Sequence, residues 1–159
     1  MRKPPPSPAP PEAGQGKRGE DGYLGYLLRQ AAGAYRLGVE RALTGLDVTP
    51  PQFAVLTMVA AYPGLSNADL ARLALLTPQT VSVIVANLER AGSLERRPHA
   101  VHGRIQHLDL SNSGRALLAT CRERVLTLEN GLVDGLTGEE ERAIRRWLVR
   151  VATSHTARP

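Results

Sequence analysis

The 159-residue sequence has little of what several classes of protein require. It contains one cysteine, Cys121, so no disulfide can form within a chain. Aromatic residues make up only 4% of the chain, whereas apolar residues of all kinds make up 42%. A core must therefore be built mainly from leucine, valine and alanine, and such a composition favours packed helices over a β-sandwich.

Long apolar runs are missing as well. No stretch approaches the roughly 20 residues that a membrane-spanning helix needs. Arg2 and Lys3 are not followed by an apolar segment, so the N-terminus lacks the pattern of a secretory signal. We therefore expect a cytoplasmic protein that contacts no membrane.

The motifs of common enzymes and metal sites are also absent. The sequence has no glycine-rich phosphate loop, no Gly-x-Ser-x-Gly turn and no close pairing of a nucleophile with a base. His107, Ser111 and Ser113 are near one another, but such residues are ordinary at the end of a strand. Neither a cysteine nor an acid joins His99, His102 and His107 at the usual spacing of a zinc site. We predict no enzyme, no cofactor and no bound metal.

Positive charge is what the sequence does have. The formal net charge is +5 and the pI is about 10.0, and nearly all of the basic residues are arginine. A basic protein suits an anionic partner, and arginine suits bidentate contacts to phosphate or guanine. Because an arginine-rich genome would produce the same bias, the charge alone does not identify the partner.

The chain divides by composition into a tail and a folded part. Residues 1–20 are rich in proline and glycine, and this predicts a disordered tail. Residues 21–159 are predicted to form a single domain. Apolar residues recur at helical spacing from Tyr23 to Leu43, which predicts an amphipathic helix. The segment Thr49-Pro50-Pro51-Gln52 predicts a capped second helix, which should end near Tyr62-Pro63-Gly64.

The next segment has the sequence form of a helix-turn-helix. A short helix is predicted from Ser66 to about Leu76, and Thr77 then caps a helix whose first residue is Pro78. The turn between the two helices is therefore predicted to be tight. The core stripe of the second helix is predicted to consist of Val81, Ile84, Val85 and Leu88.

A β-hairpin is predicted directly after these helices. Leu94–Arg97 and Ile105–Leu110 have the pattern of two strands, and Gly103 lies in the tip between them. A hairpin in this place makes residues 49–111 a winged helix-turn-helix. The predicted fold class is therefore mainly α with a small β-hairpin wing.

Two further helices are predicted after the hairpin. A long helix extends from about Ser113 to Leu136 and carries an apolar stripe that includes Cys121. A thiol buried on such a stripe is usually inert, so we do not expect Cys121 to sense oxidants. Thr137-Gly138-Glu139-Glu140 is a capping box for the last helix.

The helix Pro78–Ala91 carries short or amide side chains on its outer face. A helix enters the major groove of B-DNA only if that face is slim. Gln79 can pair bidentately with adenine, and Val83 can touch a thymine methyl group. The basic strand that follows would border a phosphate backbone. We therefore predict double-stranded DNA as the partner. The predicted DNA-binding residues are Thr77, Gln79, Thr80, Ser82, Val83, Asn87, Arg90, Arg97 and Arg104.

Taken together, several segments resemble the MarR family of transcriptional regulators. The likeness covers roughly Tyr23–Val151, and it is specific because the segments occur in the family's order and spacing. The segments are VTPPQFAVL (48–56), SNADLARLALLTPQTVSVIVANLERAGSLERRP (66–98), HLDLSNSGRALL (107–118) and LTGEEERAIRRWL (136–148).

The resemblance implies a homodimer that binds an inverted-repeat operator, commonly as a repressor. It also implies that the first and the last two helices, residues 21–45 and 113–155, form the dimer interface. On these helices the expected interface residues are Leu24, Leu28, Leu128, Leu132, Ile144, Trp147 and Leu148.

The resemblance further implies a small, often phenolic, effector that enters a cleft between the dimer helices and the DNA-binding lobe. Tyrosine and arginine suit an aromatic carboxylate, although half-buried packing explains the same tyrosines equally well. The candidate pocket residues are Tyr23, Tyr26, Arg29, Tyr35 and Phe53.

The sequence departs from the family pattern at the wing and on the reading helix. The family's wing commonly ends in Asp-Arg-Arg, whereas this chain has His102-Gly103-Arg104. Many relatives carry arginine after the serine of the reading helix, whereas this chain has Val83. The predicted DNA face is therefore poor in charge. Two alternatives stay open: a helical protein-interaction module, and a regulator without a small-molecule effector.

Overall fold

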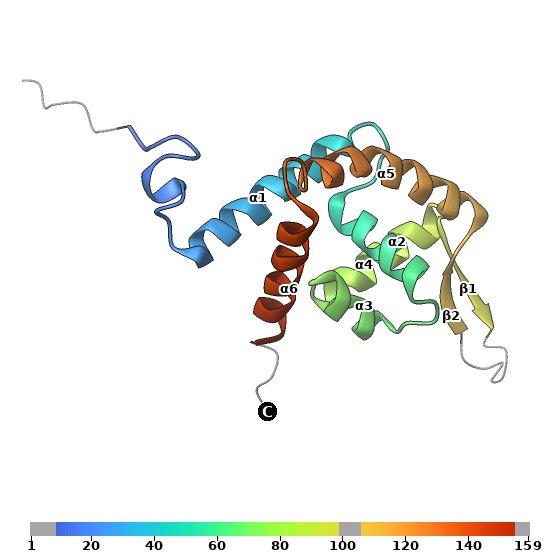
Figure 1. Ribbon diagram of the computed structural model, residues 1–159. Coiled ribbons are helices and arrows are strands. Elements are labelled where there is room, and N and C mark those ends of the chain that lie inside the picture. The colour runs from blue at the N-terminus through green and yellow to red at the C-terminus, as the bar shows by residue number, and fades with distance from the viewer. Residues whose placement is uncertain (1–8, 99–105, 155–159) are drawn as a thin grey trace, which may run out of the picture. The chain divides into compact units, whose positions relative to one another are not determined.

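The computed structural model describes residues 9–98 and 106–154. These residues form six α-helices, one short 3-10 helix and one antiparallel pair of strands (Figure 1). The chain divides into two compact units, Met1–Arg41 and Ala42–Pro159. Arg104, His99, His102 and Gly103 lie outside the described residues.

The first unit contains the 3-10 helix η1 (Gly16–Arg18) and nearly all of α1 (Leu24–Ala42). The described part of the predicted disordered tail therefore has some local structure. The Lys17 ammonium donates to the carbonyl of Asp21 at 3.0 Å and lies 5.4 Å from the centre of the Tyr23 ring. These contacts come from charged side chains and not from buried apolar surface, so composition did not indicate them.

In the second unit, α2 (Pro50–Ala61), α3 (Asn67–Ala74) and α4 (Pro78–Arg90) pack on one another (Figure 1). All three helices begin at a side-chain cap, and two of these caps, Thr49 and Thr77, are predicted from the sequence. The hydroxyls of Thr49, Ser66 and Thr77 each accept a hydrogen bond from the backbone N–H three residues later. Each cap satisfies one of the backbone donors that a helix N-terminus leaves unpaired.

The turn between α3 and α4 differs from the prediction. Helix α3 ends at Ala74 and not near Leu76, because Leu75 adopts the left-handed conformation with φ 54° and ψ 42°. Its backbone N–H still bonds to the carbonyl of Ala71, as at many helix ends. Leu73 and Leu76 fit a continuing helical period, and a leucine with positive φ leaves no mark in the sequence.

The core of the second unit holds α4 in place. The four side chains of its predicted core stripe are buried, with Val81 fully inaccessible and Ile84 8% exposed. Helix α2 contacts α4 and contributes Val55, Leu56 and Val59 to the core. Burial of each such side chain stabilises the fold by about 1.5–3 kcal/mol. The outer face of α4 is therefore presented by a helix anchored on its other side.

The hairpin consists of β1 (Leu94–Pro98) and β2 (Gln106–Leu110), paired antiparallel with Leu94 opposite Leu110. Leu94, Leu108 and Leu110 are buried, so one face of the hairpin belongs to the same core as α4. The predicted fold class, mainly α with a β-hairpin wing, is confirmed, and so are the two predicted strands, except that Ile105 lies outside the described residues.

Helix α5 (Asn112–Gly131) begins immediately after β2 and is fixed to the end of α4. The hydroxyls of Ser111 and Ser113 both donate to the carbonyl of Gly92, at 2.5 and 2.8 Å. Gly114 lies so close to the carbonyl of Ser93 that any side chain at this position would collide with it. The start of α5 and the end of α4 are thereby held together.

Helix α5 is shorter than the sequence predicts. It ends at Gly131 and not at Leu136, and a turn with Gly135 at φ 77° leads to α6 (Gly138–Ser154). Leu132 and Leu136 continue the apolar spacing of α5 through the turn, and this continuity explains the error. The predicted capping box of α6 is present, because Thr137 and Glu140 exchange backbone-to-side-chain hydrogen bonds of 2.8 and 3.3 Å.

Candidate functional site

Several hydroxyl groups at the N-terminal end of α4 form hydrogen bonds within the helix and its cap. Thr77 Oγ1 accepts from the backbone N–H of Thr80 at 3.1 Å, and the two threonine hydroxyls lie 2.8 Å apart. The Ser82 hydroxyl donates to the carbonyl of Pro78 at 2.9 Å. All three side chains are exposed, and each hydroxyl keeps acceptor capacity for a further partner.

On the outer face of α4, Gln79 and Val83 are exposed side chains that are not engaged in hydrogen bonds within the described part of the chain. Gln79 is exposed, and its amide makes no hydrogen bond within the described part of the chain. Val83 follows one helical turn later and is 57% exposed. Arg90 and Asn87, at the far end of the helix, bond to each other at 3.0 Å. The N-terminal half of this face therefore has the greatest free capacity for recognition.

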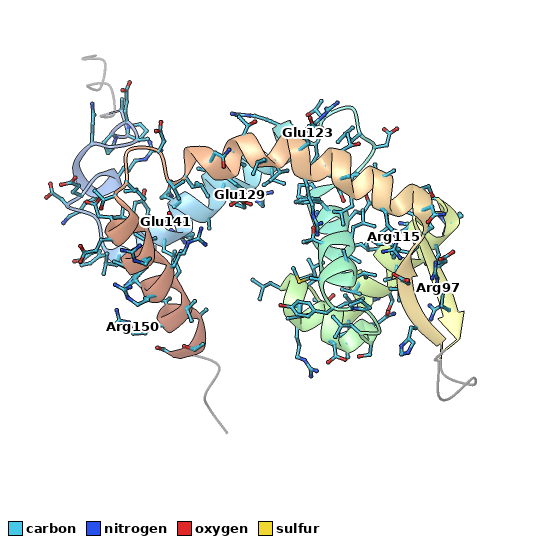
Figure 2. The ribbon with its side chains drawn as sticks, turned by 45° about the vertical axis from the view of Figure 1, so that its right-hand side comes forward. Arg97, Arg115, Glu123, Glu129, Glu141 and Arg150 are labelled. Carbon is cyan, nitrogen blue, oxygen red and sulfur yellow. The ribbon has the colours of Figure 1, made fainter. Side chains whose placement is uncertain are left out.

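A group of charges at the base of the hairpin was not predicted. Glu95 and Asp109 lie directly opposite each other in the strand pairing, an arrangement that destabilises a hairpin unless cations intervene. Arg97 lies 2.6 Å from Glu95 and 3.6 Å from Asp109. Arg115, from the first turn of α5, donates to both oxygens of Asp109 at 3.1 Å. Figure 2 labels Arg115 at the start of α5 and Arg97 on the hairpin.

Within this group, Arg97 offsets the repulsion between the carboxylates of Glu95 and Asp109. Its hydrogen bond to Glu95 is the main cause that raises the pKa of Arg97. More than half of the Arg97 side chain remains exposed, so it can still reach a phosphate, but it must share its charge with two carboxylates. The like-charged pair of Glu95 and Asp109 in the predicted hairpin was the signal that could have revealed this arrangement.

The candidate effector residues fall in both units. On α1, the Arg29 guanidinium lies 5.8 Å from the centre of the Tyr26 ring, so these two predicted residues are together. Tyr23 precedes α1 and is 81% exposed, and Tyr35 is half-buried. Phe53 belongs to α2 in the other unit, and a pocket that combines them remains a prediction.

One residue near Phe53 was missed. Thr57 lies one turn further along α2, and its Oγ1 is a buried oxygen without a hydrogen-bond partner among the described residues. A buried hydroxyl without a partner costs free energy. No sequence pattern marks such an atom.

The predicted dimer residues all lie at the surface of their units. Leu24 is 68% exposed, Leu132 53%, and Ile144 and Leu148 43% each, while Leu28, Leu128 and Trp147 are half-buried. A pocket of about 240 Å³ lies between the end of α5 and α6. Its lining includes Leu132, Val133, Leu136, Ile144 and Leu148, with Glu129, Glu141 and Arg145 at the polar side.

Other chemistry has little support in the described residues. Burial raises the pKa of the Cys121 thiol, and this lowers the reactive thiolate fraction. No group of three histidine, cysteine or acidic side chains in residues 9–98 and 106–154 could hold a metal ion. No single described helix is long and apolar enough to cross a membrane, and the pair of α3 and α4, bent by 107°, passes by length and composition alone.

Known proteins resemble the chain in sequence. Residues 46–105 match the family model described as MarR family. The chain is 34% identical over 134 residues to the HTH-type transcriptional repressor Rv2887 of Mycobacterium tuberculosis, and the match covers 84% of this chain and 96% of that protein.

Solved structures resemble its fold. Rv2887 in complex with p-aminosalicylic acid has a TM-score of 0.67 at 33% identity, covering 82% of this chain and 99% of that one. Rv2887 in complex with DNA has a TM-score of 0.64 at 33% identity, with coverage of 82% and 98%. The repressor CouR bound to a 23-mer DNA duplex has a TM-score of 0.72 at 25% identity, with coverage of 87% and 98%.

These matches confirm the resemblance and the fold class that the sequence predicts. They cover more than four fifths of the chain and so are not confined to the helix-turn-helix. The chain therefore belongs to the MarR family of DNA-binding transcriptional regulators.

Proposed function

We propose that this protein represses transcription as a homodimer bound to an inverted-repeat operator, and that a small aromatic acid releases it. The observation that carries the proposal is the outer face of α4, which is slim, exposed and poor in charge, on a helix whose opposite face is buried. Rv2887 and CouR, both repressors with this fold, have been solved with DNA.

The reading geometry follows from the anchoring of α4. Because Val81 and Val85 are fixed in the core, the helix can enter the major groove without internal rearrangement. The Gln79 amide is free to donate to and accept from adenine. Thr77 and Thr80 lie at the positive end of the helix dipole, which favours a nearby phosphate.

A second copy of the chain is the partner that fits the exposed apolar surface of α5 and α6. Five of the eight residues that line the groove between these helices are leucine, isoleucine or valine, and such exposed apolar surface is unfavourable in water. A symmetric dimer presents two reading helices, and their half-sites lie about one helical turn, ~10 bp, apart or a small multiple of it.

The effector proposal rests on the side chains of α1 and on the relatives. Rv2887 has been solved with p-aminosalicylic acid and with salicylic acid, which are both aromatic carboxylates. The Arg29 guanidinium can pair with a carboxylate, and the Tyr26 ring beside it can contact an aromatic ring.

Operator selection from random duplex DNA, followed by binding at several salt concentrations, tests the DNA part of the proposal. The selected sequences should form an inverted repeat, and the affinity should fall as salt increases because phosphate contacts release counterions. Sedimentation of the same complex should show two chains per duplex. Selection that recovers no common motif, or one chain on an isolated half-site, would contradict the proposal.

Titration of the operator complex with salicylate tests the effector part. Release of the DNA should weaken in Arg29→Gln, while operator affinity without ligand stays unchanged. Arg36→Gln is the matched control, because Arg36 is also an exposed arginine of α1. An equal loss of salicylate response in both variants, or in neither, would remove Arg29 from the ligand site.

A further inference from the structure

The turn between α3 and α4 holds an apolar side chain in an unusual state. Leu75 has φ 54° and ψ 42°, the left-handed conformation that glycine adopts freely and leucine rarely does. Its side chain is 91% exposed, which is the highest exposure among the large hydrophobic residues of the described chain. Leucine at this position is thus unfavourable for two independent reasons.

The folded chain itself supplies no reason for a leucine there. A residue that is 91% exposed gains little from packing, and glycine or asparagine would adopt the same backbone with less strain. Leu73, on α3, is 45% exposed but has ordinary helical geometry, so it carries only one of the two costs. Strained backbone of this kind clusters at functional sites.

The position of Leu75 suggests what that function is. It lies in the corner where α3 and α4 meet, two residues before the cap Thr77. It is therefore next to the end of α4 that carries Gln79, the proposed base-reading residue. Val83, 57% exposed, is a second aliphatic group on this helix, so aliphatic side chains occur on both sides of Gln79 in the chain.

We propose that Leu75 is a specificity-determining residue that packs against a thymine methyl group at the edge of each half-site. The inference rests on the proposed function, because it requires α4 to lie in the major groove. The thymine methyl is the apolar group that base pairs expose there, and an exposed leucine is a fitting partner. A surface poor in charge, such as this one, would gain specificity from apolar contacts.

The first test compares stability with affinity. Leu75→Gly relieves the backbone strain, so its melting temperature should rise. Its affinity for the selected operator should fall about 15-fold or more, because each of the two half-sites loses a methyl contact that contributes about fourfold. Leu75→Met keeps an apolar side chain and should retain most of the affinity. Leu73→Ala is the control for loss of an exposed leucine and should leave operator affinity unchanged.

The second test removes the methyl group from the DNA. Each thymine of the selected operator is replaced in turn by deoxyuridine, which lacks only the 5-methyl group. One position per half-site should cost the parent protein about fourfold in affinity and should cost Leu75→Gly nothing. Val83→Ala should keep its sensitivity at that position, because Val83 is expected to contact a different base.

The results separate this inference from the proposed function. If the parent selects no operator, the proposed function fails and the inference fails with it. If the parent binds an operator but Leu75→Gly binds equally well, or keeps every response to deoxyuridine, the inference alone is overturned. A lower melting temperature for Leu75→Gly, or a weaker dimer, would assign Leu75 to contacts within the protein and would equally overturn it.

Discussion

Helices α4 and α6 have similar amphipathic sequences but different burial. The apolar stripe of α4 is almost wholly inaccessible, and Leu88 in it is 3% exposed. Helix α6 has no buried residue, and Leu148 in its stripe is 43% exposed. An apolar period shows that a helix face needs to be covered, but it does not show whether the same chain provides the cover.

The difference follows from where the partners of each helix lie in the sequence. Helices α2 and α3 and strand β1 all contact α4, and these four elements follow one another directly in the sequence. Within the second unit, Ile144 and Leu148 of α6 line an open groove together with Leu132, Val133 and Leu136, which lie at and after the end of α5. We therefore predict that the apolar stripe of α4 serves folding and that the stripe of α6 serves association between chains.

The largest expected effect is on α4. Leu88→Ala should lower the free energy of unfolding by about 2–5 kcal/mol, because it removes buried methyl groups and leaves a cavity. Denaturation with urea at two protein concentrations measures it, and the loss should be the same at both. A loss that depends on protein concentration would show that α4 takes part in association, and the comparison between the helices would fail.

The next effect is on α6. Leu148→Glu should shift the protein toward monomers, since a charge in an apolar interface is not compensated there. Sedimentation velocity over a range of concentrations measures the shift, and circular dichroism should show that helix content is retained. Val149→Glu is the control, because the neighbouring residue points about 100° away around the helix. Equal dissociation in both variants would contradict the assigned face.

The outer face of α4 and the hairpin can be compared in their expected effects on DNA binding. Gln79→Ala should relax the choice of base at one position by about 1–3 kcal/mol, while Arg97→Ala should weaken binding to all sequences alike. Operator selection with each variant measures both outcomes. A motif that is unchanged by Gln79→Ala would remove Gln79 from the reading face, and a motif altered by Arg97→Ala would give the hairpin a reading role.

Much of the fold could be predicted because it depends on local signals. Capping residues marked the starts of α2 and α4, and apolar residues at three- and four-residue steps marked the core stripe that includes Val81 and Val85. The ends of helices were less visible. Leu76 and Leu132 continue an apolar period beyond the true ends of α3 and α5, since a turn can reverse the chain without interrupting that period.

The candidate site was predictable only in part for a different reason. The composition of the α4 face follows from sequence spacing, whereas the charge group around Asp109 depends on strand register and on a helix that begins after the hairpin. The unpaired Thr57 hydroxyl and the left-handed Leu75 depend on atomic positions that no residue type dictates. The assignment of these residues to DNA and effector remains a prediction.

The smallest expected effect concerns the start of α6, where the helix has a cap but little burial. Bonds from the backbone N–H and the hydroxyl of Thr137 lower the pKa of Glu140 below its ordinary value of 4.5. A lowered pKa means that the carboxylate stabilises the folded state at a pH above that ordinary value. This contribution is lost as the pH falls through the lowered pKa.

Glu140→Gln should therefore lower the melting temperature slightly at pH 7 and should differ less from the parent as the pH falls toward 3. Thermal denaturation between pH 3 and pH 7 measures this, with Glu123→Gln as the charge-matched control on the exposed side of α5. The control should lose no such stabilisation at pH 7. A difference in melting temperature between the parent and Glu140→Gln that stays constant with pH would mean that the cap acts through its hydrogen-bond geometry and not through the charge of the carboxylate. The start of α6 would then resemble that of α4, whose Thr77 cap is neutral.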